Sequence, residues 1–130
     1  MSVIEDNIRN IHENIAEAAL RSGRNPSDIK LMAVTKTVDD ERILEAIEAG
    51  VRIMGENYIQ EAKRKIETMD VAVQWHMIGH LQSNKSKYAV RLFDMVHSVD
   101  RMGLAAELDK RSAAAGRVTD ILVEVNVSGE

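Results

Sequence analysis

Short apolar runs alternate with stretches in which apolar residues recur at the spacing of one helix face. This alternation restricts the fold more than any other feature of the sequence. Runs with strand character lie at residues 29–34, 51–54, 73–78, 94–99 and 120–127. Stretches with helical periodicity lie at residues 2–21, 39–49, 58–69, 83–91 and 101–115. The expected N-caps are Ser2 for the first of them, Asp39 or Asp40 for the second and Ser83 for the fourth. Strands that alternate with helices form βαβ units, and βαβ units make a parallel sheet. The sequence therefore predicts an α/β fold, either an open doubly wound sheet or a closed (β/α) barrel.

The 130 residues suffice for one domain, and no linker rich in proline, glycine or serine divides them. We therefore expect residues 1–130 to form a single domain. The fifth apolar run is followed by three residues and by no helix that would cover its outer face. A closed eight-stranded barrel usually needs about 200 residues or more. We expect the chain to contain about the first five β/α units of a larger barrel.

Composition and charge exclude several classes of function. The sequence has no cysteine, which excludes disulfides, thiolate zinc sites and cysteine nucleophiles. The formal net charge of −4 provides no general attraction to nucleic acid. No apolar run approaches the roughly 18 residues that span a bilayer, and the first residues do not resemble a secretory signal. We expect a cytoplasmic protein that binds neither membranes nor nucleic acid.

Each predicted strand ends in residues that form hydrogen bonds, and in parallel α/β folds the carboxyl ends of the strands line the ligand site. The polar groups at these ends are Thr35, Lys36 and Thr37; Glu56 and Asn57; His80; Ser98 and Asp100; and Asn126 and Ser128. Together they predict a binding site at this rim.

Lys36 is the most informative of these residues. A lysine directly after an apolar strand is anchored by the sheet, and desolvation of its stem favours the neutral amine that attacks an aldehyde. The alternative is a solvated lysine in a surface ion pair with Asp39 or Asp40.

For several other polar residues we expect packing or capping roles. His76, His80 and His97 lie on or beside strands without thiolates or a carboxylate cluster, so we expect no metal site. His76 is expected to pack within its strand and His80 to lie on the rim. After Gly55, Glu56 or Asn57 is expected to cap the next helix. No phosphate-binding loop and no Gly-x-Gly-x-x-Gly motif is present.

Four segments occur in an order and at strand-end positions that resemble one known family. They are residues 33–37 (AVTKT), 55–61 (GENYIQE), 75–85 (WHMIGHLQSNK) and 125–130 (VNVSGE). Together they resemble the pyridoxal phosphate homeostasis protein family, whose fold is similar to the N-terminal barrel of alanine racemase. The resemblance runs from about residue 5 to the last residue.

The resemblance implies a (β/α)8 barrel of the TIM type that binds pyridoxal 5'-phosphate (PLP), here truncated to about five β/α units. It places the lysine that forms a Schiff base with PLP at Lys36, and other cofactor-facing positions at Asn57, His80, Ser98 and Asn126. It implies a carrier or buffer in vitamin B6 homeostasis, with no catalytic residue. In such barrels the phosphate is held after strands 7 and 8, so we expect this chain to lack that contact.

Two further hypotheses remain. One is a PLP-dependent amino-acid racemase similar to alanine racemase, which needs a base on each face of the cofactor. Lys36 supplies one base, Tyr58 lies at the start of a helix, and residues 37–40 differ from the tyrosine-bearing continuation of alanine racemase. The other is self-association through the apolar first and fifth strands, whose edges are expected to be open.

Overall fold

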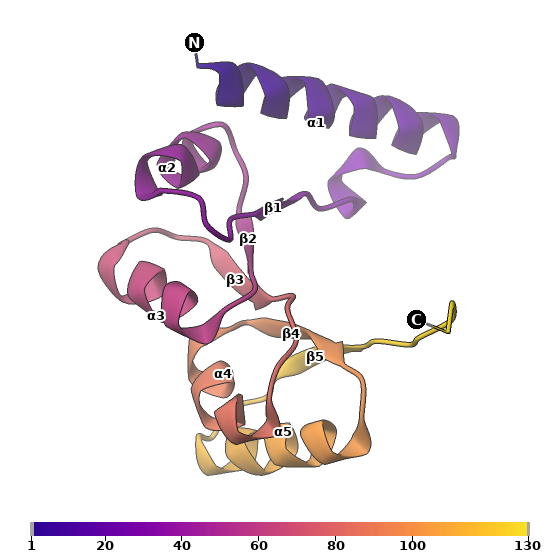
Figure 1. Cartoon of the computed structure of the whole chain (residues 1–130). Helices are drawn as coiled ribbons and strands as arrows, with labels where there is room; N and C mark the ends of the chain where they lie inside the picture. The colour runs from indigo at the N-terminus through magenta and orange to yellow at the C-terminus, as the bar shows by residue number, and fades with distance from the viewer. Residues whose placement is uncertain (1, 130) are drawn as a thin grey trace.

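The computed structural model describes residues 2–129, in which helices and strands alternate along the chain as predicted (Figure 1). The strands are β1 (Met32–Val34), β2 (Ile53–Glu56), β3 (Gln74–Met77), β4 (Met95–Val99) and β5 (Asp120–Val123). The α-helices are α1 (Val3–Arg21), α2 (Asp40–Glu48), α3 (Ile59–Thr68), α4 (Ser86–Leu92) and α5 (Met102–Ala114). Two 3-10 turns are η1 (Pro26–Asp28) and η2 (Ser83–Lys85).

The strands form one parallel sheet in the order β1-β2-β3-β4-β5. Because each new strand adds to the same edge, crossovers of a single hand place the connecting helices on one face of the sheet. In Figure 1, α2 to α5 follow one another along that face. A doubly wound sheet instead reverses its strand order and carries helices on both faces. The α/β prediction is confirmed, and the sheet is wound as in a (β/α) barrel.

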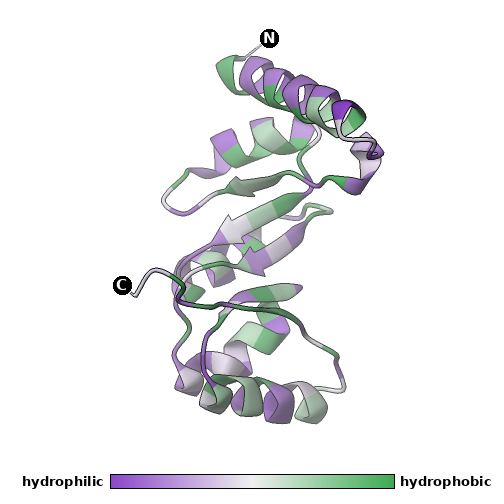
Figure 2. Ribbon diagram, turned by 90° about the vertical axis from the view of Figure 1, so that its right-hand side faces the viewer, coloured by the Kyte–Doolittle hydropathy of each residue, from purple (hydrophilic) through white to green (hydrophobic). Residues whose placement is uncertain are grey.

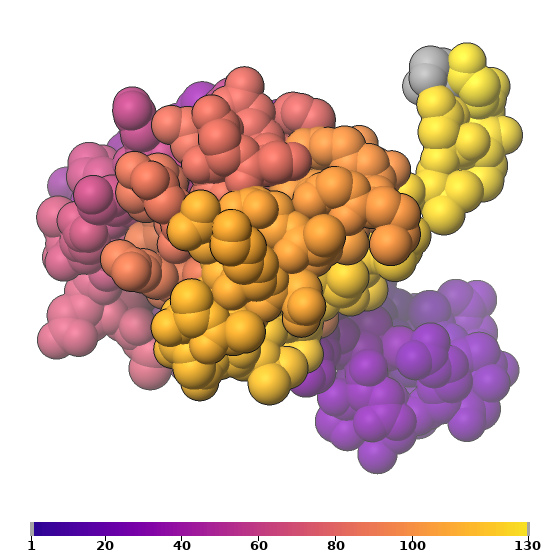
Figure 3. Space-filling view, turned by 90° about the horizontal axis from the view of Figure 1, so that it is seen from below, coloured from indigo at the N-terminus to yellow at the C-terminus, as the bar shows by residue number. Residues whose placement is uncertain are grey.

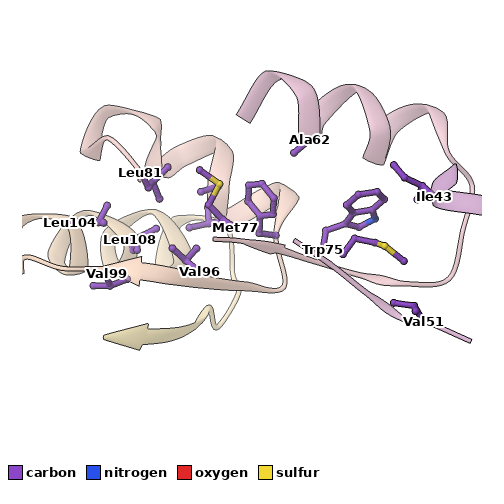
Figure 4. Packing of buried hydrophobic residues seen from close by; sticks show 14 of the residues in the cluster. Ile43, Val51, Ala62, Trp75, Met77, Leu81, Val96, Val99, Leu104 and Leu108 are labelled. Atoms are coloured by element: carbon purple, nitrogen blue, oxygen red, sulfur yellow. The ribbon is translucent and has the colours of Figure 1, made fainter. Parts of the chain in front are cut away.

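The core lies between the sheet and these helices. Alternate residues of the central strands face the helices, namely Met54, Trp75, Met77 and Val96. The helices contribute Ile43, Ala62, Leu104 and Leu108, as Figure 4 shows. Burial of a large apolar side chain contributes roughly 1.5–3 kcal/mol. This packing holds the strands in register and so fixes where their carboxyl ends meet.

The first helix begins as its sequence predicts. Ser2 is the N-cap of α1, and its Oγ accepts a hydrogen bond from the Glu5 amide at 3.1 Å. The helix has bands of hydrophobic and hydrophilic residues (Figure 2), and it packs against α2 with Ile8 buried. None of the helices within residues 2–129 is long and apolar enough to cross a membrane.

The two outer strands are shorter than predicted. The expected strand at 29–34 pairs only from Met32, and the expected strand at 120–127 ends at Val123. Each outer strand has a ladder partner on one side only, so less of its length is fixed by hydrogen bonds. The amide of Glu124 still donates to the Val99 carbonyl at 2.9 Å. Apolar side chains of this last segment are exposed, with Leu122 at 49% and Val127 at 91%.

The segment at 83–91 also differs from its prediction. Ser83 was expected to cap a helix, but Ser83–Lys85 forms the 3-10 turn η2 and α4 begins at Ser86. The N-cap of η2 is Gln82, which makes no side-chain capping bond.

Candidate functional site

Lys36 lies one residue beyond the hydrogen-bonded ladder between β1 and β2. The amide of Thr35 still donates to the Gly55 carbonyl at 2.9 Å. The chain then turns away from the sheet, and Thr37 adopts a left-handed conformation with φ of 60°. Lys36 itself is exposed, so the expectation of a desolvated stem is wrong.

The alternative surface ion pair for Lys36 is also wrong. Asp40 instead forms a bidentate pair with Arg64 of α3, at 2.9 and 3.1 Å. The hydrogen bond from Arg64 lowers the pKa of Asp40. Asp39 caps α2 by accepting a hydrogen bond from the Arg42 amide at 3.0 Å. Neither carboxylate forms an ion pair with Lys36.

A buried ion-pair cluster, which was not predicted from the sequence, lies next to Lys36. Lys65 of α3 is fully buried, and its Nζ lies 2.9 Å from Oε2 of Glu56 and 2.9 Å from Oε2 of Glu61. Glu56 is also fully buried, whereas the Glu61 side chain is 24% exposed. We call Glu56, Glu61 and Lys65 the Lys65 cluster. Oε2 of Glu56 accepts a further, short hydrogen bond from the Thr35 hydroxyl, while its Oε1 accepts none from the described residues.

The Lys65 cluster contacts the backbone on both sides of Lys36. Nζ of Lys65 donates to the Thr35 carbonyl at 2.7 Å, and this bond completes the three that an ammonium group can donate. Oε2 of Glu61 accepts a hydrogen bond from the Thr37 amide at 2.7 Å. Burial raises the pKa of Glu61, but the hydrogen bonds from Lys65 and Thr37 and the charge of Lys65 lower it by more. The pKa of Glu61 therefore lies below its usual value.

This arrangement contradicts the expected cap of the helix after β2. Neither Glu56 nor Asn57 caps α3; its N-cap is Tyr58, which makes no side-chain capping bond. The Glu56 carboxylate is directed to Lys65 instead.

Asn57 packs directly against the loop that carries His80. A Cβ atom on Gly79 would lie 2.6 Å from the Asn57 carbonyl oxygen and 2.8 Å from its Cα. Only a glycine allows this approach, so Gly79 brings the ends of β2 and β3 together. Asn57 is half-buried, and His80 is exposed on the rim as expected.

The remaining two predicted site residues have different surroundings. Ser98 lies within β4, is 2% exposed, and its Oγ has no hydrogen-bond partner among the described residues. Asn126 follows β5 in an exposed segment, where its Oδ1 accepts a hydrogen bond from the Gly129 amide at 2.9 Å. Figure 3 shows this segment projecting from the body of the protein. The site roles of Ser98 and Asn126 remain predictions.

The histidines of β3 and β4 face away from the helices and contact each other. His76 Nδ1 lies 2.9 Å from His97 Nε2, and His76 Nε2 lies 3.0 Å from Oε1 of Gln74. Burial lowers the pKa of both histidines, and the charge of His97 lowers that of His76 further. His76 is 6% exposed, which confirms that it packs within the strand. Within residues 2–129, no three His, Cys, Asp or Glu side chains are grouped to hold a metal ion.

An open cavity of about 660 Å³ lies at the opposite end of the sheet from Lys36. Its walls come from residues that precede or begin β1, β2 and β3: Ile29–Leu31, Gly50–Ile53 and Ala72–Gln74, together with His12 of α1. None of the predicted site residues lines it. In barrels of this type the amino ends of the strands serve stability and the carboxyl ends carry the chemistry, so we assign the site to the Lys36 rim.

The rim offers an exposed primary amine with amide and imidazole side chains on the two neighbouring strand ends. A primary amine reacts reversibly with an aldehyde, and amide and imidazole groups form hydrogen bonds with the polar substituents of an aromatic aldehyde. The donor set therefore fits a small aldehyde cofactor.

The chain is similar to a known family along almost its whole length. Residues 7–130 match the family described as alanine racemase, N-terminal domain. The pyridoxal phosphate homeostasis protein of Escherichia coli (strain K12) is 40% identical over 134 aligned residues, and that of Pseudomonas aeruginosa is 43% identical over 131. Each alignment covers 100% of this chain and 57% of the relative, so the chain spans little more than half the length of these relatives. The predicted resemblance is confirmed.

Solved structures share the fold. An unknown protein from Bifidobacterium adolescentis superposes with a TM-score of 0.82 at 37% identity, covering 98% of this chain and 56% of the other. PipY of Synechococcus elongatus PCC7942, with PLP bound, superposes with a TM-score of 0.74 at 43% identity, covering 87% of this chain and 55% of the other.

Proposed function

The chain belongs to the alanine racemase N-terminal domain family, and from this premise we propose that it binds PLP at the Lys36 rim and serves vitamin B6 homeostasis without catalysing a reaction. The observation that carries the proposal is the exposed amine of Lys36, at the residue where the chain leaves the sheet after β1. The names of the relatives and the PLP bound to PipY support the choice of cofactor.

Lys36 holds the cofactor as a Schiff base in this proposal. The neutral Nζ attacks the aldehyde carbon, and a C–N bond forms. The aldehyde oxygen then leaves as water with both amine hydrogens, so that a C=N bond remains. The step needs no oxidant or reductant, and water reverses it. A cofactor held in this way stays deliverable, which suits a carrier.

Asn57 and His80 are the groups that we propose to orient the cofactor ring. They follow β2 and β3, the first and second strands along the sheet from β1, and Gly79 holds their loops in contact. Ser98 and Asn126 complete the proposed set from the ends of β4 and β5. An amide and an imidazole both donate and accept hydrogen bonds, which suits the ring substituents of PLP.

No observation favours the racemase alternative. The Tyr58 side chain is 60% exposed and belongs to the N-cap residue of α3, not to a strand end that faces Lys36. We therefore propose that the protein is not a racemase.

We further propose that residues 1–130 act as one domain in the cytoplasm, with PLP as partner and without a nucleic-acid partner. The exposed apolar residues of β5 and the segment after it support self-association with a second copy of this chain. Sedimentation at several concentrations tests this, because a monomer at every concentration contradicts it.

The deciding experiment for the proposed function is site mapping. The chain is mixed with PLP at low concentration, the absorbance is scanned, the imine is reduced with borohydride, and the peptides are mapped by mass. We expect the adduct on the peptide that contains Lys36 and its loss in Lys36→Met. Label spread evenly over Lys63, Lys85, Lys87 and Lys110 contradicts the proposal.

A further inference from the structure

The two peptide groups that flank Lys36 are both held by α3. The Thr35 carbonyl belongs to the peptide group before Lys36 and accepts a hydrogen bond from Lys65 Nζ at 2.7 Å. The Thr37 amide belongs to the peptide group after Lys36 and donates to Glu61 Oε2 at 2.7 Å. Lys65 and Glu61 also bond to each other at 2.9 Å, so one ion pair holds both groups.

Peptide groups are planar, so the only soft backbone angles between these two planes are φ and ψ of Lys36. Fixing both planes therefore fixes the direction of the Cα–Cβ bond of Lys36. The side-chain torsions of Lys36 remain free, but the direction in which the side chain leaves the backbone is fixed. The backbone on the far side is also strained, because Thr37 is β-branched and has a φ of 60°. The hydrogen bond to Glu61 compensates for that strain.

We infer that Lys65 and Glu61 are positioning residues, which aim Lys36 at the aldehyde of its cofactor through the two peptide groups on either side of it. This inference rests on the proposed function. Glu56 supports the pair, because its carboxylate provides the second negative partner for the buried ammonium of Lys65. A merely structural ion pair between α3 and β2 needs no contact with the residues around Lys36, whereas both contacts are present.

Glu61 is the residue to change first, since its side chain is partly exposed and its loss leaves Lys65 paired with Glu56. Glu61→Ala removes the acceptor for the Thr37 amide. Glu61→Gln restores an acceptor oxygen at the same length without the charge. The matched control is Arg64→Met, also in α3, which breaks the exposed pair with Asp40 of α2 without removing a contact to the peptide groups beside Lys36.

Two readouts separate positioning from stability. The first is hydrogen exchange of the Thr37 amide in the protein without cofactor. The second is the yield of reduced PLP adduct on Lys36 relative to Lys63, an exposed lysine of α3 that serves as an internal standard. Loss of one charge-assisted hydrogen bond corresponds to roughly tenfold or more in an equilibrium constant. We expect Glu61→Ala to accelerate the exchange and lower the Lys36 to Lys63 ratio about tenfold, Glu61→Gln to restore much of both, and Arg64→Met to change neither.

Lys65 needs a variant that leaves no unpaired buried charge. Lys65→Met combined with Glu56→Gln replaces the buried pair by neutral groups of similar size. The same changes in exchange and adduct ratio are expected, and circular dichroism establishes that the variant is folded. If it does not fold, Glu61→Ala alone decides.

Failure of this inference is distinguishable from failure of the proposed function. Wild-type protein that labels at Lys36, with Glu61→Ala labelling equally well, overturns the positioning role and leaves the function intact. Wild-type protein that never labels at Lys36 overturns the function. In that case unchanged exchange of the Thr37 amide in Glu61→Ala overturns the positioning role as well, and accelerated exchange supports the hold on the peptide groups.

Discussion

The close approach of Gly79 to Asn57 makes a quantitative prediction for Gly79→Ala. A Cβ atom at this position would lie 2.6 Å from a backbone oxygen and 2.8 Å from a backbone Cα. Ordinary contacts of this kind begin near 3.4 Å, so one of the two loops has to move by most of an ångström. Backbone atoms move less easily than the tip of a side chain. Overpacking of this kind costs about 1–3 kcal/mol of the free energy of unfolding.

Urea denaturation measures this loss. With a slope of about 1–3 kcal/mol per molar urea, a loss of about 2 kcal/mol lowers the midpoint by roughly 1 M. Gly79→Ala also displaces Asn57 and the loop before His80, so we expect a weaker PLP complex at Lys36. Gly103 in α5 has no heavy atom within 4 Å of its would-be Cβ and provides the control. Gly103→Ala is expected to be neutral or stabilising by up to about 1 kcal/mol.

The result that refutes this reasoning is a Gly79→Ala protein with the midpoint of wild type. It would mean that the two loops separate without a loss of stability, so that their contact does not organise the rim.

Three further predictions concern pH, turnover and metal. The pKa values of His76 and His97 are lowered in the folded state, so below about pH 6.5 the unfolded chain takes up protons that the folded chain does not. The free energy of unfolding should therefore decrease as the pH is lowered in this range, less steeply in His97→Gln than in wild type, and equal slopes in the two proteins would refute this. Chiral chromatography after incubation of alanine with protein and PLP should detect no racemisation, and turnover that disappears in Lys36→Ala would show the protein to be a racemase. Elemental analysis should find no stoichiometric metal, and one zinc per chain would contradict this.

Local signals in the sequence predict most of the fold. The cap at Ser2 is confirmed, as is the cap of α2 by Asp39, one of the two expected candidates, because a cap depends on a few neighbouring residues. The strand positions follow from apolar runs, and the rim follows from the rule that parallel strands present their carboxyl ends together. The predicted lengths of β1 and β5 were wrong because the length of a strand depends on how many neighbouring strands supply hydrogen bonds, and the local sequence does not reveal that number.

The Lys65 cluster beside Lys36 was not predicted, for a different reason. Glu61 and Lys65 are four residues apart on a helix, a spacing that normally indicates a solvent-exposed pair. Nothing local reveals that this face of α3 is turned toward the sheet. The available signal was Glu56, a charged residue at the end of an otherwise buried strand, which needs a buried partner of opposite charge. Lys65, nine residues later, is that partner.

The geometry of the rim thus depends on contacts between successive β/α units. Lys36 belongs to the first unit, yet the groups that hold its backbone, Glu61 and Lys65, lie on the helix of the next. Gly79 has the same effect one unit further along, because it holds the end of β3 against Asn57 at the end of β2. The ends of β1 and β2 are thus each held by residues that follow the neighbouring strand. In the proposed mechanism, Lys36 therefore acquires its direction only when the second β/α unit has packed beside the first.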